Sequence, residues 1–176
     1  MNTLDYKTET RLQVSINLPI SKSVLNRELI LAASSGTLLL SIATDGLADD
    51  SLMLLNALKS QEKTINIGHA GTAMRFLTAH FASVEGEHLL QGSSRMHERP
   101  IKILVDALRE LGADIRYAGK EGFPPLEIRG KKLKGGKVSI SGAVSSQYIS
   151  ALLLCGSSFK NGLDLERTNV GDQPAS

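Results

Sequence analysis

The chain has 176 residues, 41% of them hydrophobic, which is enough to bury the core of a globular protein of about one domain. Its 20 basic and 18 acidic residues give a formal net charge of +2, far from the dense positive field of a nucleic-acid-binding protein. A single cysteine, Cys155, excludes an internal disulfide and a multi-cysteine metal site. The polar N-terminal sequence and the lack of an apolar run of about 20 residues predict a cytoplasmic protein with no membrane partner.

Hydrophobic periodicity predicts alternating strands and helices in the first part of the chain. Apolar and polar residues alternate in LQVSINL, which is typical of a half-buried strand and ends at Pro19. Apolar residues then recur at helical spacing from Ser23 to near Gly36, a residue type at which helices often end. The expected elements are strands over 12–18, 38–42 and 65–67, and helices over 23–36 and from Asp49 to Leu58.

The same order of elements then starts again, which predicts an internal repeat. LLNALK begins at Leu54 and the similar LVDALR begins at Leu104, while Arg27 and Arg75 occupy similar positions in two other helices. The order of strands and helices predicts an α/β fold with parallel pairing inside each unit. The second copy is expected to contain helices over 74–82 and 99–111 and strands over 88–90, 114–117, 126–129 and 138–141, before a further helix at SSQYISALLLC.

Four segments of small or hydroxyl residues, most of them with a basic residue, run directly into an expected helix. The first N–H groups of a helix have no partner within the helix, and its dipole is positive at that end, so phosphate and carboxylate groups bind there. The recurrence predicts a binding site for anionic ligands. The four segments are LPISKSVLNR, IGHAGTAMR, SSRMHERP and VSSQ.

In the first segment, Lys22, Ser23 and Arg27 together can clasp one phosphate. Ser23 offers a hydroxyl and Lys22 an ammonium group, and Arg27 lies four residues after Ser23 on the same helix face. The alternative is that Ser23 caps the helix while Lys22 and Arg27 are solvated. This segment alone does not decide between the two interpretations.

The second and third segments also have two interpretations each. Gly68 and Gly71 let the backbone approach a ligand and Thr72 can cap or donate, but the segment can equally be an ordinary glycine turn. Arg95 and Arg99 lie before or at a helix start, where the dipole disfavours positive charge unless an anion binds. The alternative for these arginines is a surface ion pair with a nearby glutamate.

The remaining candidates are explained more simply by structure than by chemistry. The consecutive serines of VSSQ are neutral donors that often serve as helix caps, and Asp49 and Asp50 are expected to cap their helix together with Ser51. Cys155 lies in an apolar helix and is expected in the core. The histidines show no tight ligand spacing, so we expect no metal. Neither GxSxG nor a complete Walker A motif occurs.

Taken in order, the four segments resemble the motifs of the 5-enolpyruvylshikimate-3-phosphate synthases. LPISKSVLNR resembles the signature LPGSKSxxNR of this family, IGHAGTAMRF resembles GNAGTAMRP, and RMHERP and VSSQ follow in the same order. The resemblance spans about Leu18 to Cys155. It implies the enolpyruvyl transferase fold, in which each of two domains is built from three βαβαββ units.

The resemblance also implies a division of this chain. Residues 1–18 would be an N-terminal strand and crossover segment. Residues 19–176 would be a substrate-binding domain made of two units and the start of a third, and the second domain would be absent. A C-terminal domain or a complementary chain is therefore an expected partner.

The activity implied by the resemblance is transfer of the enolpyruvyl group of phosphoenolpyruvate to the 5-hydroxyl of shikimate 3-phosphate, with release of phosphate. The reaction belongs to aromatic amino-acid and chorismate biosynthesis and needs no cofactor. Both substrates are anions, as the four segments suggest. The residues carried over are Lys22, Ser23, Arg27, Ser145, Ser146 and Gln147 for shikimate 3-phosphate, Lys22, Gly71, Thr72 and Arg99 for phosphoenolpyruvate, and Lys22 as the catalytic residue.

Several positions depart from the family pattern, and other interpretations stay open. Ile20, His69 and Phe76 replace a Gly, an Asn and a Pro of the motifs, so neither the shape of the phosphoenolpyruvate pocket nor sensitivity to the inhibitor glyphosate carries over. The UDP-N-acetylglucosamine enolpyruvyl transferases share the fold but have KN where this chain has Lys22 and Ser23. The alternative from a different class is a non-catalytic anion-binding fragment, or half of a split enzyme.

Overall fold

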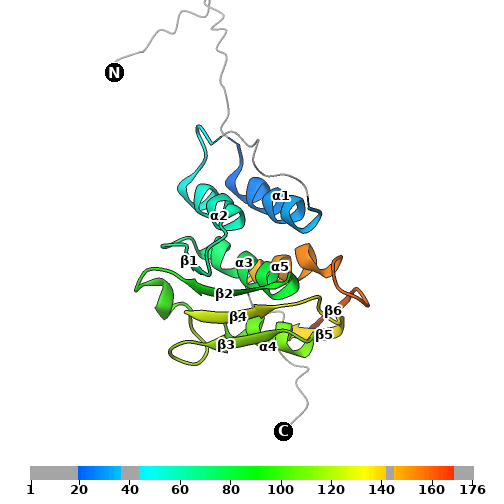
Figure 1. The fold of residues 1–176 in the computed structure, drawn as a ribbon. Coiled ribbons are helices and arrows are strands. Elements are labelled where there is room, and N and C mark those ends of the chain that lie inside the picture. The colour runs from blue at the N-terminus through cyan, green and yellow to red at the C-terminus, as the bar shows by residue number, and fades with distance from the viewer. Residues whose placement is uncertain (1–19, 37–43, 142–144, 169–176) are drawn as a thin grey trace, which may run out of the picture.

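The structure, a computed structural model, describes residues 20–36, 44–141 and 145–168 (Figure 1). The strands expected over 12–18 and 38–42 lie outside the described residues. In the described part, the helices and short strands up to α5 follow the order that the sequence predicts. The elements are α1 (Lys22–Ser34), α2 (Asp49–Lys59), β1 (Thr64–Asn66), α3 (Gly71–Ser83), β2 (Gly86–Gln91), a 3-10 turn (Met96–Glu98), α4 (Lys102–Glu110), β3 (Asp114–Tyr117), β4 (Leu126–Gly130), β5 (Gly136–Ser141), α5 (Ser146–Gly156) and β6 (Leu163–Thr168).

Two sheets organise these elements. The first has the strand order β1-β2-β4-β3, with β1 parallel to β2 and the other neighbours antiparallel. The second is a parallel pair of β5 and β6. The expected parallel pairing is confirmed for β1–β2 and for β5–β6, each joined through a helix. It is wrong for β2–β4 and β3–β4, which are antiparallel. The connection between β3 and β4 is so short that it allows only an antiparallel hairpin.

The sheet pairing also moves the boundaries of the repeat. The segment β1-α3-β2-α4-β3-β4 is a complete βαβαββ unit, and β5-α5-β6 repeats its first half with the same parallel pairing. The strand expected over 138–141 therefore begins a new unit rather than completing the second one. Strand β6 was not predicted from the sequence.

Helix α3 lies at the centre of the fold. It contacts α1, α2, α4, α5 and strands β2 and β4, and every residue of this helix except Thr72 is buried. Figure 1 shows α1 and α2 above α3 and α5, with the four-stranded sheet below them. The N-terminus of α3 is thus held from several sides, which matters because two candidate ligand residues lie there.

The start of α4 and the capping of α2 differ from the sequence expectation. Helix α4 was expected from Arg99 but begins at Lys102. Arg99 has extended backbone angles (φ −93°, ψ 117°) because the ring of Pro100 disfavours a helical conformation in the residue before it. Helix α2 begins at Asp49, but its N-cap residue is Ala48 and no side chain caps it. The expected capping role of the aspartates is therefore wrong, although Asp49 and Asp50 lie in the first turn, where the helix dipole favours negative charge.

The side chain near the C-terminal end of α3 that bears on acid stability is His80. His80 is buried, and its Nδ1 lies 3.4 Å from the Ser34 hydroxyl of α1. Burial, with a smaller contribution from the neighbouring His88, lowers the pKa of His80 to about 4. The imidazole is neutral in the folded protein at pH 7 and resists protonation until the solution is strongly acidic.

None of the helices in the described part of the chain combines the length and apolarity needed to cross a bilayer.

Acid should destabilise the fold through His80. In the unfolded chain the pKa of this side chain returns to about 6.5, so unfolding takes up a proton between that pH and a pH of about 4. We expect the free energy of unfolding to fall by up to about 3 kcal/mol as the pH drops through this window. Urea unfolding at a series of pH values measures the effect. His80→Asn, which is neutral throughout, should flatten the curve, and parallel curves for the two proteins would contradict the prediction.

Candidate anion-binding site

The first candidate residues lie at the start of α1. Ser21 is the N-cap and makes no side-chain capping bond, so the interpretation of Ser23 as the cap is wrong. Instead, Ser23 lies inside the helix, where Arg27 Nη1 donates to its carbonyl oxygen at 2.7 Å and also to its hydroxyl. The Arg27 guanidinium therefore folds back toward the start of its own helix.

Lys22 meets a carboxylate of the neighbouring helix. Its Nζ lies 3.1 Å from Asp50 Oδ2 in α2. The Lys22 side chain is 51% exposed and that of Asp50 is 21% exposed, and such a pair stabilises the fold by less than about 1 kcal/mol. An anionic ligand with several oxygens can therefore compete for the ammonium group. Asp50, expected only as a cap, is a neighbour of the site that the sequence did not reveal.

The start of α3 is shaped by a glycine turn. Gly68 has a positive φ of 54°, which a residue with a side chain rarely adopts. Its N–H donates to Asn66 Oδ1 at 2.9 Å, and its carbonyl accepts from the Ser93 N–H at 2.8 Å. This turn brings the loop after β2 against the loop after β1. The N-cap residue of α3 is Ala70, and no side chain caps this helix.

Arg99 packs directly against Gly71, the first residue of α3. A Cβ atom added to Gly71 would overlap Nη1 of Arg99 and would lie 2.8 Å from Nη1 of Arg75. A side chain at this position would have to displace the Arg99 guanidinium. Arg75 Nη1 also donates to the Gly71 carbonyl at 2.7 Å. The structure thus brings Arg99 from the third segment to the glycine of the second.

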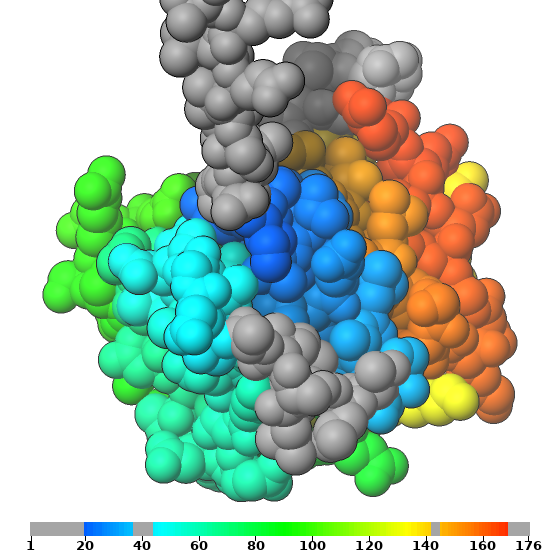
Figure 2. Space-filling model, turned by 90° about the horizontal axis from the view of Figure 1, so that it is seen from above, coloured from blue at the N-terminus to red at the C-terminus, as the bar shows by residue number. Residues whose placement is uncertain are grey.

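The start of α5 connects the other segments. Ser145 is the N-cap, and its hydroxyl accepts from the Gln147 N–H at 3.3 Å, so the capping interpretation is confirmed for this serine. Gln147 Nε2 donates to Thr72 Oγ1 of α3 at 3.3 Å. On the next turn of α5, Ser150 accepts from Arg27 Nη2 at 3.4 Å. Figure 2 shows α1 (blue) between α2 (cyan) and α5 (orange) on one face of the molecule.

A pocket of about 270 Å³ opens beside these contacts. It is lined by His69, Arg95, Met96 and Arg99. His69, Arg95 and Arg99 are exposed, and Met96 forms the buried floor. No acidic side chain lines the pocket, and its two guanidinium groups present the planar forks that bind phosphate and carboxylate. The pocket suits a small anion.

The structure unites most but not all of the expected residues. Contacts join Arg27 to α5, Gln147 to Thr72, and Gly71 to Arg99. Lys22 and Ser146 are exposed and make no contact with the other expected residues among the described interactions. Two buried side chains behind the site, Arg75 and Tyr148, were not among the expected site residues. Arg75 ends the segment IGHAGTAMR, four residues after Gly71, and Tyr148 directly follows Gln147.

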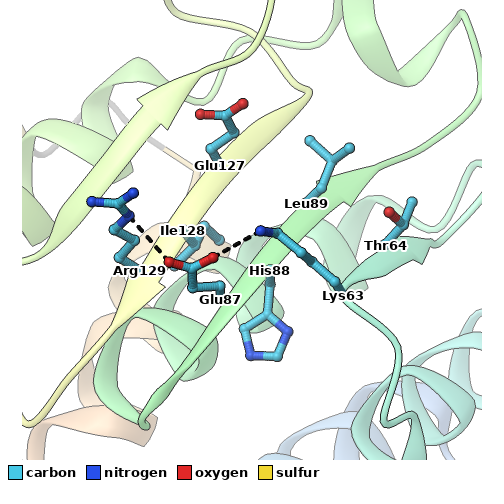
Figure 3. Close-up of a pocket in the computed structure, with 8 residues that line it drawn as sticks. All are labelled: Lys63, Thr64, Glu87, His88, Leu89, Glu127, Ile128 and Arg129. Atoms are coloured by element: carbon cyan, nitrogen blue, oxygen red, sulfur yellow. Dashed lines mark hydrogen bonds and ion pairs between the residues drawn. The ribbon is translucent and has the colours of Figure 1, made fainter.

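A second pocket, of about 220 Å³, lies on the four-stranded sheet (Figure 3). Its cations already have carboxylate partners: Lys63 Nζ lies 2.7 Å and Arg129 Nε 3.4 Å from the oxygens of Glu87. The ring of His88 points away from these residues and stacks on Phe81, with ring centroids 4.0 Å apart. These charged side chains form exposed ion pairs on the surface of the sheet. The cations are therefore already neutralised, and we do not assign an anion site to this pocket.

Cys155 is confirmed as a core residue. It is fully buried in α5, and burial raises the pKa of its thiol to about 12. A thiol with that pKa carries almost no thiolate at neutral pH, so it is not a nucleophile. Among the described residues, no group of three or more His, Cys, Asp or Glu side chains lies close enough to hold a metal ion.

Comparison with known proteins connects this geometry to one family. The family model of EPSP synthase (3-phosphoshikimate 1-carboxyvinyltransferase) matches residues 53–175. The chain is 51% identical to a 3-phosphoshikimate 1-carboxyvinyltransferase of Bacteroides fragilis strain YCH46, with 90% of this chain and 38% of the relative covered. It is 46% identical to the protein of the same name from Haemophilus influenzae strain PittEE, with 86% of this chain and 42% of the relative covered.

Solved structures agree on the fold. The 2.37 Å structure of EPSP synthase from Acinetobacter baumannii superposes with a TM-score of 0.67 at 23% sequence identity, over 92% of this chain and 41% of that one. The chain thus spans about 40% of the length of the proteins it matches. The family model covers well over half of this chain. The chain therefore belongs to the EPSP synthase family.

Proposed function

We propose that this chain binds shikimate 3-phosphate and phosphoenolpyruvate and supplies part of the site for enolpyruvyl transfer between them. The observation that carries the proposal is the set of contacts that links the starts of α1, α3 and α5 with the arginine pocket. These helix starts offer N–H groups, hydroxyls and guanidinium groups to anions in one region. A member of the EPSP synthase family would need such a region for its two anionic substrates.

The two substrates divide the region between them. The exposed start of α1 and the start of α5 would hold shikimate 3-phosphate, and the glycine turn with the arginine pocket would hold phosphoenolpyruvate. Lys22 would reach both ligands when it leaves Asp50. The proposed ligands of shikimate 3-phosphate are Lys22, Ser23, Arg27, Ser145, Ser146 and Gln147, and those of phosphoenolpyruvate are Lys22, Gly71, Thr72 and Arg99.

The reaction proposed for the complete site proceeds in two steps. The methylene carbon of phosphoenolpyruvate takes up a proton while the 5-hydroxyl oxygen bonds to C2 and loses its own proton, which gives a tetrahedral intermediate. The bond from C2 to the phosphate oxygen then breaks, and a methyl proton leaves as the double bond forms again. Lys22 would stabilise the negative charge of the transferring groups. We assign neither proton-transferring group to a described residue.

The length of the chain favours an incomplete site. The matched relatives continue well beyond the region that this chain covers, and the pocket residues His69, Arg95 and Arg99 are open to solvent. Residues 19–176 would then form a substrate-binding domain made of two repeat units and the start of a third. A non-catalytic anion-binding fragment or half of a split enzyme is the second candidate. The expected cytoplasmic location stays a prediction.

The first test is turnover with and without the rest of the enzyme. We expect no release of phosphate from the two substrates by this chain alone, because water has free access to the site. Addition of a polypeptide that corresponds to the remainder of the Bacteroides fragilis relative should restore release. Turnover by the chain alone would contradict the incomplete site, and the lack of turnover in the mixture would favour the non-catalytic fragment.

Loss of the Arg27 guanidinium should weaken binding of shikimate 3-phosphate. Removal of a charge-assisted hydrogen bond costs about 1.5–3 kcal/mol, so Arg27→Ala should raise the dissociation constant about 10- to 100-fold in calorimetric titration. The matched control is Arg116→Ala, which removes an exposed arginine of β3. Equal affinities of Arg27→Ala and the unmodified chain would show that Arg27 only stabilises its helix and the contact with Ser150.

A side chain at position 71 should weaken the binding of phosphoenolpyruvate more than that of shikimate 3-phosphate. In Gly71→Ala the new Cβ displaces the Arg99 guanidinium, so we expect the affinity for phosphoenolpyruvate to fall about 10-fold. The affinity for shikimate 3-phosphate should change less than about 2-fold. Gly119→Ala is the control, because its added Cβ meets only Pro125 Cδ at 3.6 Å. Unchanged phosphoenolpyruvate binding in Gly71→Ala would remove Gly71 and Arg99 from the site.

A further inference from the structure

Two buried polar side chains lie directly behind the proposed phosphoenolpyruvate side. Arg75 of α3 and Tyr148 of α5 are each 7% exposed. Neither side chain is open to solvent as that of Arg99 is. A buried guanidinium is costly unless its donors and its charge are satisfied, so its partners indicate what it does in the fold.

The partners of Arg75 are backbone and hydroxyl oxygens, not a carboxylate. Nη1 donates to the Gly71 carbonyl at 2.7 Å, and the Tyr148 hydroxyl is a near neighbour that favours the charged form of the guanidinium. Nε is buried without a partner, and none of the ion pairs in the described part of the chain includes Arg75. Burial, and to a lesser extent the nearby Arg99, lower the pKa of this guanidinium. Its position is therefore fixed by neutral partners.

Tyr148 connects the same arginine to the segment that carries Arg99. Its hydroxyl donates to the carbonyl oxygen of Pro100 at 2.6 Å, and Pro100 directly follows Arg99 in the chain. The proline ring restricts the backbone on both sides, so a fixed Pro100 carbonyl also restricts the backbone that carries the Arg99 side chain. The preceding residue, Gln147, bonds to Thr72 of α3.

These contacts form one path from Gly71 through Arg75 and Tyr148 to Pro100. We propose that Arg75 and Tyr148 are positioning residues, which hold the Gly71 and Pro100 carbonyl groups so that the Arg99 guanidinium lies over Gly71, ready for an anion. The proposal rests on the proposed phosphoenolpyruvate site and adds the two residues that set its geometry. The Arg75 and Arg99 guanidinium groups, which both approach Gly71, repel each other. The hydrogen bond from Tyr148 to the Pro100 carbonyl opposes their separation in the absence of ligand.

Tyr148→Phe is the sharpest test, because it removes one hydroxyl and keeps the ring in the core. Loss of the hydrogen bond should release the Pro100 carbonyl and raise the dissociation constant for phosphoenolpyruvate about 5- to 10-fold, as measured by phosphorus NMR titration. The affinity for shikimate 3-phosphate should change less than about 2-fold. A purely structural role would either leave both affinities unchanged or lower both together, and either result would overturn the proposal.

Tyr117→Phe is a matched control. The Tyr117 hydroxyl is also buried, but it has no hydrogen-bond partner in the described residues and belongs to β3 rather than to the site. Its removal should leave the affinity for phosphoenolpyruvate unchanged. Equal weakening by Tyr117→Phe and Tyr148→Phe would mean that phosphoenolpyruvate binding responds to general loosening of the core, and the proposal would be wrong.

Hydrogen exchange tests the positioning without any ligand. The Arg99 N–H donates to the Met96 carbonyl at 3.1 Å, and the Ile101 N–H donates to the Gly122 carbonyl at 2.9 Å. In Tyr148→Phe both amides should exchange about 5- to 10-fold faster than in the unmodified chain, while amides of β4 keep their rates. Unchanged exchange of both amides would overturn the proposal even if the unmodified chain bound neither substrate, an outcome that would contradict the proposed function separately.

Discussion

Helix α3 is enclosed by four other helices and by the four-stranded sheet, and this enclosure determines the geometry of the candidate site. A helix that is buried along its whole length cannot shift or rotate without opening the core. Its first residue, Gly71, is therefore a fixed point in the fold. The guanidinium groups of Arg75 and Arg99 approach this point so closely that a single methyl group would displace one of them. The packing of the core thus sets the position of the buried Arg75 and of the exposed Arg99 beside it.

Local sequence patterns predicted most elements because their signals are local. Strand β3 has the expected bounds, Asp114–Tyr117, since turn residues flank a short alternating run. Strand β6 was missed because Leu163 and Leu165 are its only regularly spaced apolar residues, and its partner β5 lies far back in the chain. The start of α4 was predicted three residues early. The spacing of apolar residues contains no information on the backbone of Arg99, which Pro100 keeps out of the helical conformation.

The candidate site was predictable only on the side that faces the ligand. Lys22, Arg27 and Arg99 are recognisable because a cation beside a helix start is a pattern of neighbouring residues. The roles of Arg75 and Tyr148 depend on partners that lie in other elements, such as the Pro100 carbonyl that accepts from Tyr148. The spacing of apolar residues along the chain does not show whether an arginine in a helix will be buried against a loop or exposed at the edge of the helix. The packing of the helix against other elements decides this.

The exposure of the cations in the candidate site gives a physical reason to expect that this chain binds anions more readily than it catalyses their reaction. Lys22, Arg95 and Arg99 lie in contact with water, where the interaction of a charge with phosphate is screened and amounts to about 1 kcal/mol at 4 Å. The same contacts strengthen several-fold when a second surface excludes water from the site. The described elements provide the geometry of the anion site but no cover for it. A polypeptide that closes over α1, α5 and the arginine pocket would therefore increase the electrostatic contribution of residues that are already in position.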